Sequence, residues 1–284
     1  MFKEYYALTK PERTYANVIT ATAGFLLASK WHIHVGLLVS LLVGTSLVIA
    51  SACTLNNYID RDIDTKMART KKRALAKRII PARNALVLTI VLGLVGFLVL
   101  ALWVNLLVVT LGVIAYFDYV VLYGIAKRRS VHGTLVGTVS GAIPIVAGYC
   151  AVTDRIDAAV IILFLMMTFW QMSHFFAIAV YRMKDYAAAG IPVLPVKKGI
   201  RRTKVQIVVY AAAFTVSSVS LSLFGYAGYA FAVIMAFLGG VWLWRGLRGF
   251  GTEDDVAWAR KMFFFSLKAV LVLSLWVAIG GIVP

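Results

Sequence analysis

Charged side chains are scarce in this sequence. Asp, Glu, Lys and Arg make up 14% of its 284 residues, whereas 61% are hydrophobic, and the mean hydropathy is +0.86. No soluble domain of this size needs so much apolar surface, so the composition excludes the ordinary soluble classes. The fold class that it predicts is an all-α polytopic membrane protein.

Cysteine is rare, and acidic residues are far fewer than basic ones. The two cysteines, Cys53 and Cys150, lie inside apolar runs. This placement excludes a disulfide framework or a cysteine metal cluster and predicts small buried thiols. The formal net charge is +17, which in a soluble protein would indicate nucleic acid. Here the basic residues fall in short loops between apolar runs, so they report membrane topology, and no nucleic-acid partner is expected.

The sequence also lacks a signal peptide, an organelle import leader and a fixed-period repeat. Its first residues, MFKEYYALTKPERTYAN, are polar and contain no apolar stretch followed by a small-residue cleavage site. We therefore expect a bacterial cytoplasmic (inner) membrane rather than a mitochondrial one. No loop is long enough for a separate extramembrane domain, so residues 1–284 are predicted to form a single intramembrane domain.

The sequence does have nine apolar runs long enough to cross a bilayer, which takes about 17–25 residues. The runs are residues 14–30, 35–57, 84–103, 105–125, 131–152, 157–180, 205–224, 226–244 and 262–282. The five connections on one side hold 3, 9, 3, 7 and 4 Lys and Arg residues, which is 26 of the 29 in the chain. The positive-inside rule makes this side cytoplasmic, with the N-terminus inside and the C-terminus outside.

A cluster of acidic residues follows the second run. If the helix continues through Asp64, then Asn57, Asp60 and Asp64 are spaced i, i+3, i+7 on one stripe, while Asp62 points elsewhere. Hard oxygens of this kind suit Mg²⁺, which usually bridges carboxylates to a substrate phosphate. The alternative is that these are ordinary loop acids at a helix end, although acids near the hydrocarbon are usually functional.

Two groups of basic residues accompany these acids. Arg69 and Arg73 are spaced i, i+4 just beyond them, and arginine binds phosphate oxygens in a bidentate manner. At the end of the fourth run Tyr123 and Lys127 are also i, i+4, followed by Arg128. Both groups could serve only as topology signals. Taken with the acids, they predict a site for a metal–diphosphate ligand.

A second constellation ends the sixth run. Trp170, His174, Tyr181 and Asp185 fall on one helical stripe, and Lys184 lies beside Asp185. The aromatic residues could instead be helix packing or an interfacial belt. His174 lies well inside a span, where three roles remain open: a hydrogen bond to a polar substrate, ligation of heme iron, or a hydrogen bond to a neighbouring helix.

These motifs resemble the UbiA superfamily of intramembrane prenyltransferases. That family has nine helices, an N-x-x-x-D-x-x-x-D-type motif after helix 2, here Asn56/Asn57–Asp60–Asp64, and a second acidic motif after helix 6. The resemblance is greatest to the branch that acts on heme. It extends over nearly the whole chain, through TKPERTYANVITATAGFLLAS, NNYIDRDIDTKMARTKKRAL, YGIAKRRSVHGTLVGTVSGAIPIVAGYCAVTD, WQMSHFFAIAVYRMKDYAAAGIPVLPVKKG and WARKMFFFSLKAV.

The resemblance implies that farnesyl diphosphate binds with Mg²⁺ between the two motifs and alkylates the vinyl group of heme B, with hydration. It implies metal binding by Asn57, Asp60, Asp64 and Asp185. It implies diphosphate binding by Arg69, Arg73, Tyr123, Lys127, Arg128 and Lys184. Catalytic roles fall to Asp60, Asp64, Asp185, Lys184 and Tyr181, and heme contacts to His174 and Trp170. The implied partners are the lipid bilayer and a heme A synthase or terminal oxidase.

Two departures from the family pattern stand out. Tyr181 occupies the place of the first aspartate of the second motif, as expected in the heme branch, and Ser173 stands where proline is expected before His174. Two other functions compete with heme farnesylation. One is a prenyltransferase of the same fold acting on a quinone precursor or another aromatic acceptor. The other is a non-enzymatic membrane protein for heme delivery or transport, which would more often show broken helices at mid-bilayer.

Overall fold

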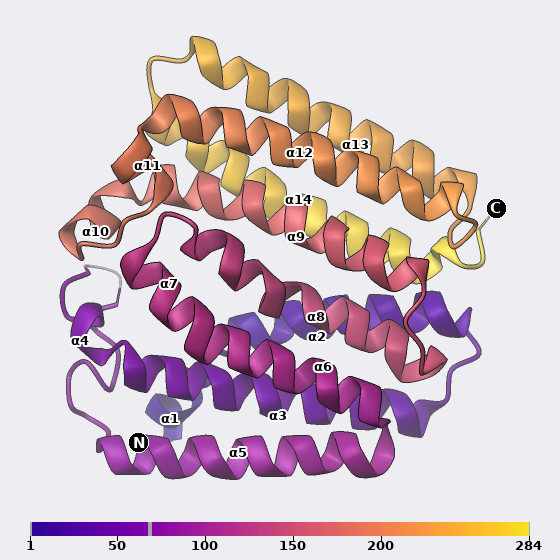
Figure 1. Cartoon of the computed structure of the whole chain (residues 1–284), viewed down its shortest axis with the longest axis horizontal. Helices are drawn as coiled ribbons and strands as arrows, with labels where there is room; N and C mark the ends of the chain where they lie inside the picture. The colour runs from indigo at the N-terminus through magenta and orange to yellow at the C-terminus, as the bar shows by residue number, and fades with distance from the viewer. Residues whose placement is uncertain (1, 68–69, 284) are drawn as a thin grey trace.

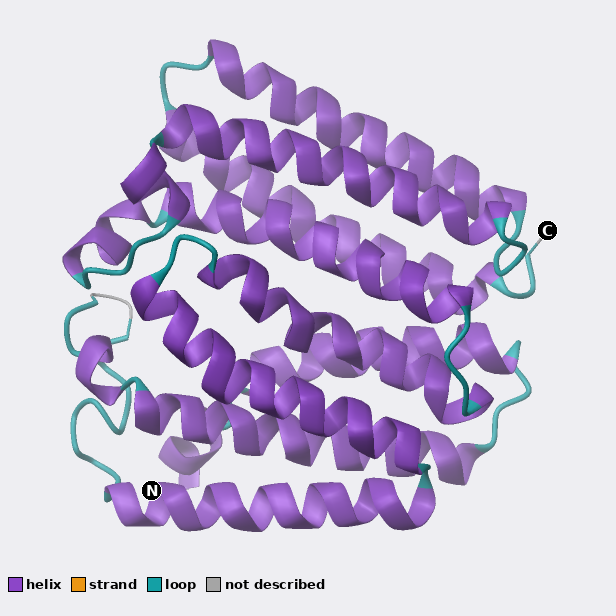
Figure 2. Cartoon of the chain, in the orientation of Figure 1, coloured by secondary structure: helices purple, strands orange, loops and turns teal. Residues whose placement is uncertain are grey.

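The computed structural model describes residues 2–67 and 70–283, in which all the regular structure is helical (Figure 2). The long helices are α2 (Pro11–Ser29), α3 (Val35–Ile59), α5 (Ala82–Trp103), α6 (Leu106–Phe117), α8 (Gly133–Thr153), α9 (Ala158–Tyr181), α12 (Ile200–Leu223), α13 (Tyr229–Arg248) and α14 (Asp255–Gly280). The short ones are α1 (Phe2–Leu8), α4 (Arg61–Asp64), α7 (Tyr123–Arg129), α10 (Met183–Ala188) and α11 (Leu194–Lys198). A π-helical stretch, η1 (Asp118–Leu122), joins α6 to α7, and a 3-10 turn, η2 (Gly249–Gly251), follows α13.

Eight helical segments among the described residues are long and apolar enough to cross a membrane. They are α3, α5, the continuous α6–η1–α7, α8, α9, α12, α13 with η2, and α14. This confirms a multi-pass helical membrane protein. The first of the nine predicted spans, residues 14–30, lies in α2, which is not among the eight, so the ninth span and the orientation stay predictions.

The helices lie roughly side by side, with α5 and α13 at opposite edges of the bundle (Figure 1). In the first half α3 packs on α5 and α2 packs on α8, and in the second half α12 packs on both α9 and α13. The two halves meet where α8 and α2 contact α9 and α14. The longer connections, with α4, α10, α11 and η2, gather at one end of the bundle, opposite the C-terminus (Figure 1).

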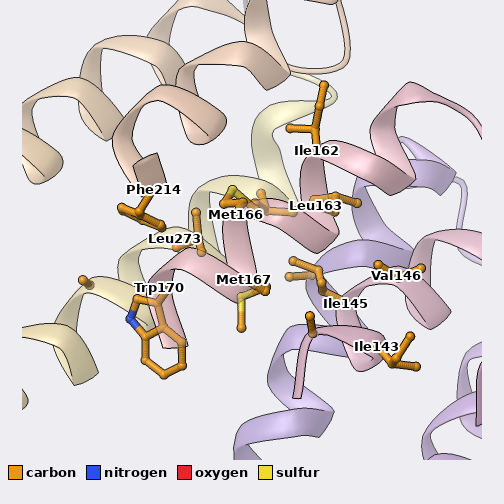
Figure 3. Packing of buried hydrophobic residues seen from close by; sticks show 14 of the residues in the cluster. Ile143, Ile145, Val146, Ile162, Leu163, Met166, Met167, Trp170, Phe214 and Leu273 are labelled. Atoms are coloured by element: carbon orange, nitrogen blue, oxygen red, sulfur yellow. The ribbon is translucent and has the colours of Figure 1, made fainter. Parts of the chain in front are cut away.

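Close backbone contact joins α2 to α8. A Cβ placed on Gly24 would lie 2.0 Å from the Ile145 carbonyl oxygen, and one on Gly148 would lie 1.9 Å from the Ala21 carbonyl oxygen. Small residues allow this approach, which replaces the hydrophobic driving force that is missing between helices in lipid. Around α9, large side chains such as Met166, Met167 and Phe214 fill the centre of the bundle (Figure 3).

The structure corrects two expectations about helix continuity and adds one feature. The helix that should have carried the first acidic stripe through Asp64 ends at Ile59, and Asp60, with φ −89° and ψ 1°, joins α3 to α4. Likewise α9 ends at Tyr181, so Asp185 lies on a separate helix after a break at Arg182. The fourth predicted span contains the π-helical stretch at Asp118–Leu122, which the apolar pattern did not indicate.

Candidate active site

The end of the bundle with the longer connections contains a cavity of about 120 Å³. Its wall comes from α2, η1, α7, α8, α9 and the connection through α10, so segments far apart in the sequence meet there. The polar lining includes Arg13, Tyr119 and Lys127, and the apolar lining includes Phe175 and Ile191. A polar rim above an apolar, aromatic wall suits a ligand with an ionic head and a hydrocarbon tail.

Asp60 lies beside this cavity and is almost fully buried. Its carboxylate forms an ion pair with the Lys127 ammonium group, which lines the cavity. The Arg128 guanidinium lies 3.3 Å from the other carboxylate oxygen, and the amide of Asn56 donates a hydrogen bond of 3.0 Å. Asp60 thus joins the end of α3 to the end of α7, and this explains why the chain bends at Asp60.

Asp64 is also buried and is held by Arg73. The guanidinium nitrogen Nη1 of Arg73 lies 2.8 and 3.0 Å from the two carboxylate oxygens. Two predicted diphosphate-binding residues, Lys127 and Arg73, therefore neutralise two of the three predicted metal-binding carboxylates, Asp60 and Asp64. As a result, neither the two carboxylates nor their cationic partners are left as isolated buried charges.

Arg128, which contacts Asp60, also binds Asp62. Its guanidinium donates hydrogen bonds of 3.0 Å to both Asp62 oxygens, and this contact lowers the pKa of the Asp62 carboxyl. Asp62 is much more exposed than Asp60, with 59% against 7% of its side chain accessible. Because the Asp62 side chain is so exposed, its ion pair with Arg128 contributes little to stability.

The two asparagines of the first motif have different surroundings. Asn56 contacts Asp60, whereas Asn57 donates from Nδ2 to the Leu8 carbonyl oxygen at 2.8 Å. The Asn57 Oδ1 atom is buried and has no hydrogen-bond partner within the described part of the chain. An unpaired buried oxygen is costly unless something satisfies it, and a hard cation is one such partner.

The donor set fits a metal that is shared with a diphosphate and not one held by protein alone. Among residues 2–67 and 70–283 there is no group of three or more His, Cys, Asp or Glu side chains that could hold an ion. Asn57, Asp60 and Asp64 nevertheless supply hard oxygens. Mg²⁺ is commonly bound by one or two carboxylates plus substrate phosphate and water, and this set matches that chemistry.

A buried lysine that the sequence analysis missed supports the first motif. Lys10 donates from Nζ to the Asn56 Oδ1 at 2.8 Å, and the Tyr119 hydroxyl donates to the same oxygen at 3.3 Å. The Arg13 guanidinium in turn donates to the Tyr119 hydroxyl at 2.8 Å. The local signal was the basic residues Lys10 and Arg13 close to Pro11, which does not reveal a contact to a residue 46 positions away.

Tyr123, a predicted diphosphate contact, stacks on Tyr119 with ring centroids 5.8 Å apart. The Lys127 ammonium lies 5.2 Å from the Tyr123 ring centroid. Gly137 on α8 makes room for this ring, because a Cβ there would lie 2.7 Å from it. The two tyrosine rings and the lysine therefore form one wall of the cavity.

A buried carboxylate that the sequence analysis missed positions these tyrosines. Asp118 begins the π-helical stretch η1, and its Oδ2 accepts a hydrogen bond of 3.0 Å from the backbone N–H of Ser140 on α8. π-Bulges inside α-helices occur frequently at functional sites. An aspartate in the middle of an apolar run was the available signal, since ionisable residues inside spans are rare and functional.

The residues of the second motif have partners other than the carboxylates of the first motif. Asp185 is half-buried, with the Arg182 guanidinium 4.0 Å away, and Lys184 is exposed. Tyr181 packs against Phe263 of α14, with ring centroids 6.4 Å apart. An apolar cluster of Ile63, Met67 and Ile191 joins the segments that follow the two motifs, with Tyr186, Ala189 and Val193 packed against it. The structure thus brings the two motif segments together through this cluster, and it brings Asp185 into no metal-binding group of the described residues.

His174 has a partner on a neighbouring helix. Its Nδ1 lies 2.6 Å from the Ser266 hydroxyl of α14, and its ring stacks on Trp170 at a centroid distance of 4.9 Å. Trp170 donates from Nε1 to the Ser266 carbonyl oxygen at 2.8 Å. Of the three roles left open for His174, the geometry supplies the hydrogen bond between helices. Arg69, predicted to bind diphosphate, lies outside the described residues.

Comparison with known proteins decides the family. Residues 17–267 match the UbiA prenyltransferase family. The chain belongs to this family. It is 49% identical over 285 residues to the protoheme IX farnesyltransferase of Citrobacter koseri, with 100% of this chain and 96% of that protein covered. The protein of the same name from Klebsiella pneumoniae is also 49% identical, with 100% and 97% covered. The chain is thus an enzyme, a prenyltransferase.

Solved structures show the same fold at lower identity. A structure described for digeranylgeranylglyceryl phosphate synthase superposes with a TM-score of 0.82 at 18% identity, covering 99% of this chain and 98% of that one. A UbiA homologue from Archaeoglobus fulgidus bound to GPP and Mg²⁺ gives 0.74 at 15% identity, covering 97% and 99%. These similarities confirm the UbiA-type fold that the sequence motifs implied.

The buried Lys10 ammonium makes a pH-dependent contribution to stability. Burial lowers the pKa of Lys10 well below its ordinary value of 10.5. The unfolded chain therefore binds one more proton than the folded chain between the two pKa values, and stability rises with pH across that window. We expect the apparent melting temperature of the wild type to rise, relative to Lys10→Met, as the pH increases toward 10. Parallel curves for the two proteins would contradict this role of Lys10.

Proposed function

We propose that the enzyme transfers a farnesyl group from farnesyl diphosphate to the vinyl group of heme B, with addition of water. The observation that supports this most directly is the pairing of two buried carboxylates with cationic side chains at the rim of an aromatic-lined cavity. The names of the relatives at 49% identity point to the same donor and acceptor. In this proposal the whole chain, residues 1–284, acts as one intramembrane domain.

The basic side chains would hold the diphosphate. Lys127, Arg128 and Arg73 are paired with carboxylates in the free protein, and we infer that they turn toward the diphosphate oxygens when the substrate enters. Each exchange replaces one charge-assisted contact with another, so no cation is left unpaired. Lys184 and Arg69 would add contacts from the two flanking segments, and Tyr123 a hydroxyl from the cavity wall.

Asn57, Asp60 and Asp64 would hold Mg²⁺ together with the diphosphate, and Asp185 would contribute directly or through water. When bound, the metal neutralises charge that develops on the leaving diphosphate. The unpaired Asn57 Oδ1 is the feature of the first motif that most directly favours this assignment.

In the reaction, the bond between the allylic carbon and the diphosphate oxygen breaks, and its electron pair leaves with the diphosphate. The π-electrons of the heme vinyl group then form the new carbon–carbon bond to the allylic cation. Water adds to the resulting cation on the heme side chain, and its proton passes to solvent. The Tyr119 and Tyr123 rings would stabilise the allylic cation through their faces, and apolar residues such as Phe175 would exclude water until transfer. Tyr181, at the end of α9, would face the reacting groups from the side opposite Tyr119 and Tyr123.

We also propose how the chain sits in the membrane. We infer that α2 is the ninth span, because it is packed within the bundle against α8 and α14. The end with the longer connections would face the cytoplasm of a bacterium, since it carries most of the basic residues. A heme A synthase or a terminal oxidase would then receive the product.

A panel of acceptors tests the proposed substrate. The purified protein would be incubated with farnesyl diphosphate and Mg²⁺, together with heme B, a hydroxybenzoate or a naphthoate, and the products identified by mass spectrometry. A farnesylated, hydrated heme as the main product would support the proposal. Prenylation of the aromatic acids without modification of heme would assign the quinone-precursor activity. Binding and release of heme without any prenyl transfer would contradict the enzymatic proposal altogether.

His174 and Trp170 are proposed to lie against the heme, and a pair of variants separates this role from helix packing. His174→Ala should raise the KM for heme B roughly tenfold, the effect of losing about one hydrogen bond or stacking contact, with the KM for farnesyl diphosphate unchanged. Ser266→Ala removes the partner of His174 but not the ring, so its effect on the heme KM should be smaller. Equal effects of the two variants on both substrates would indicate packing alone.

A further inference from the structure

A second cavity, of about 380 Å³, lies at the same end of the molecule between α13, α14 and the loop residues Thr252 and Asp254. Its lining includes Trp244, Arg245 and Arg248 from α13 and Trp258 and Lys261 from α14. It is separate from the candidate active site. On α14 Met262 lines this second cavity, whereas its neighbour Phe263 faces the other way and packs on His174, with ring centroids 5.2 Å apart.

Hydrogen bonds and an ion pair connect the helices next to this cavity. Trp258 donates from Nε1 to the Arg245 carbonyl oxygen at 3.0 Å. The buried Lys204 ammonium donates to the Gly249 carbonyl oxygen at 2.6 Å and forms an ion pair with Asp255. A Cβ on Gly249 would lie 2.3 Å from the Trp258 ring, so η2 sits directly against this tryptophan. These contacts join α12, α13, η2 and α14 beside the cavity.

The lining of the cavity carries more positive than negative side chains. Arg245, Arg248 and Lys261 are exposed, and within the described part of the chain none of them forms an ion pair with a carboxylate. Aromatic rings hold two of them instead: Arg248 lies 4.3 Å from the Trp244 ring centroid and Arg245 lies 4.8 Å from that of Phe265. The single acidic lining residue, Asp254, caps α14 by accepting from the Ala257 N–H at 2.9 Å.

The residues around the cavity are of the kinds that occur at the boundary between lipid and water. Trp244, Leu247 and Phe264 are exposed beside it, as expected of side chains that face lipid, while the loop with Thr252 and Asp254 carries polar groups. Tryptophan is enriched at this depth of the bilayer, and arginine extends its charge toward the head groups while its stem stays in hydrocarbon. Basic pockets between membrane helices on the cytoplasmic side are typical sites for anionic lipid head groups.

We propose that this cavity binds the phosphate of an anionic phospholipid, with its acyl chains along the exposed faces of α13 and α14. The three cations without carboxylate partners would contact the phosphate oxygens, and the tryptophan rings would pack against the glycerol. A cavity of this size is large enough for such a head group.

Native mass spectrometry with added phosphatidylglycerol or phosphatidylcholine tests this site. The wild type should retain phosphatidylglycerol about tenfold more tightly than phosphatidylcholine, from several cations acting together. The triple variant R245Q/R248Q/K261Q should lose this preference. K198Q/R201Q/R202Q removes the same charge from exposed positions near the start of α12 and should keep it. Should the triple variant misfold, R248Q/K261Q alters only two exposed side chains and should lower the preference in part.

Three results would overturn the proposal. One is an equal affinity of the wild type for the two lipids, and another is an equal loss of preference in the pocket variant and the matched control. The third is displacement of phosphatidylglycerol by millimolar inorganic phosphate, which would make the cavity a site for free anions and not for lipid.

Discussion

Asp64→Asn is expected to lower kcat for farnesyl transfer about a thousandfold, because it removes one negative charge from the proposed metal–diphosphate site. Asparagine matches aspartate in shape, so the backbone of α4 should be retained. Arg73 loses its ionic partner, but its side chain is 24% exposed and can be solvated. The measurement is steady-state turnover of farnesyl diphosphate and heme B at saturating Mg²⁺.

Asp62→Asn is the matched control for this variant. It makes the same chemical change two residues away, on a carboxylate that is 59% exposed and whose ion-pair partner among residues 2–67 and 70–283 is Arg128. We expect its kcat to stay within about threefold of the wild type, since exposed ion pairs contribute little. Comparable losses in the two variants would mean that the acidic segment acts as a whole and would contradict a specific role of Asp64.

Gly148→Ala is expected to have the largest effect on stability. Its Cβ would lie 1.9 Å from the Ala21 carbonyl oxygen, a backbone atom that cannot move without separating α2 from α8. The cost should reach the upper part of the range for overpacking, about 3 kcal/mol. Because α2 carries Arg13 at the wall of the active-site cavity, activity should fall together with the apparent melting temperature.

Gly240→Ala provides the comparison. Gly240 also lies in a membrane helix, α13, and beyond its own turn of helix a Cβ there would meet no atom of the described residues within 4 Å. Alanine is a better helix former than glycine, so this change should be neutral or slightly stabilising. If Gly148→Ala melted no lower than Gly240→Ala in the same detergent, the close packing of α2 on α8 would not be a determinant of stability.

The sequence predicts the general architecture well because apolar length is a local property. Nearly every predicted run coincides with a long helix, and the segments of the two acidic motifs lie at one end of the bundle, as their positions after spans 2 and 6 indicated. The first predicted run also forms a helix, α2, but this helix is less apolar than the eight candidate membrane spans. The motifs also indicated the family, which the comparison confirms.

The features of the site that the sequence did not predict depend on contacts between distant segments. The spacing of residues along one helix gives no information on such contacts. The chain bends at Asp60 where Lys127 and Arg128 reach its carboxylate from α7. Lys10 contacts Asn56 across 46 positions, and Asp118 accepts from Ser140 across 22. The prediction that Asp185 and His174 lie on one helical stripe was wrong for the same reason. The helix breaks at Arg182, and the chain changes direction there.

Isotope labelling of the product tests the central claim most directly. The protein would be incubated with heme B, ¹³C-labelled farnesyl diphosphate and Mg²⁺ in H₂¹⁸O, and the porphyrins analysed by mass spectrometry. The account predicts a single heme product that carries the whole labelled farnesyl group and one ¹⁸O atom. Unmodified heme alongside ¹⁸O-labelled farnesol, or alongside a labelled farnesyl group on another acceptor, would contradict it.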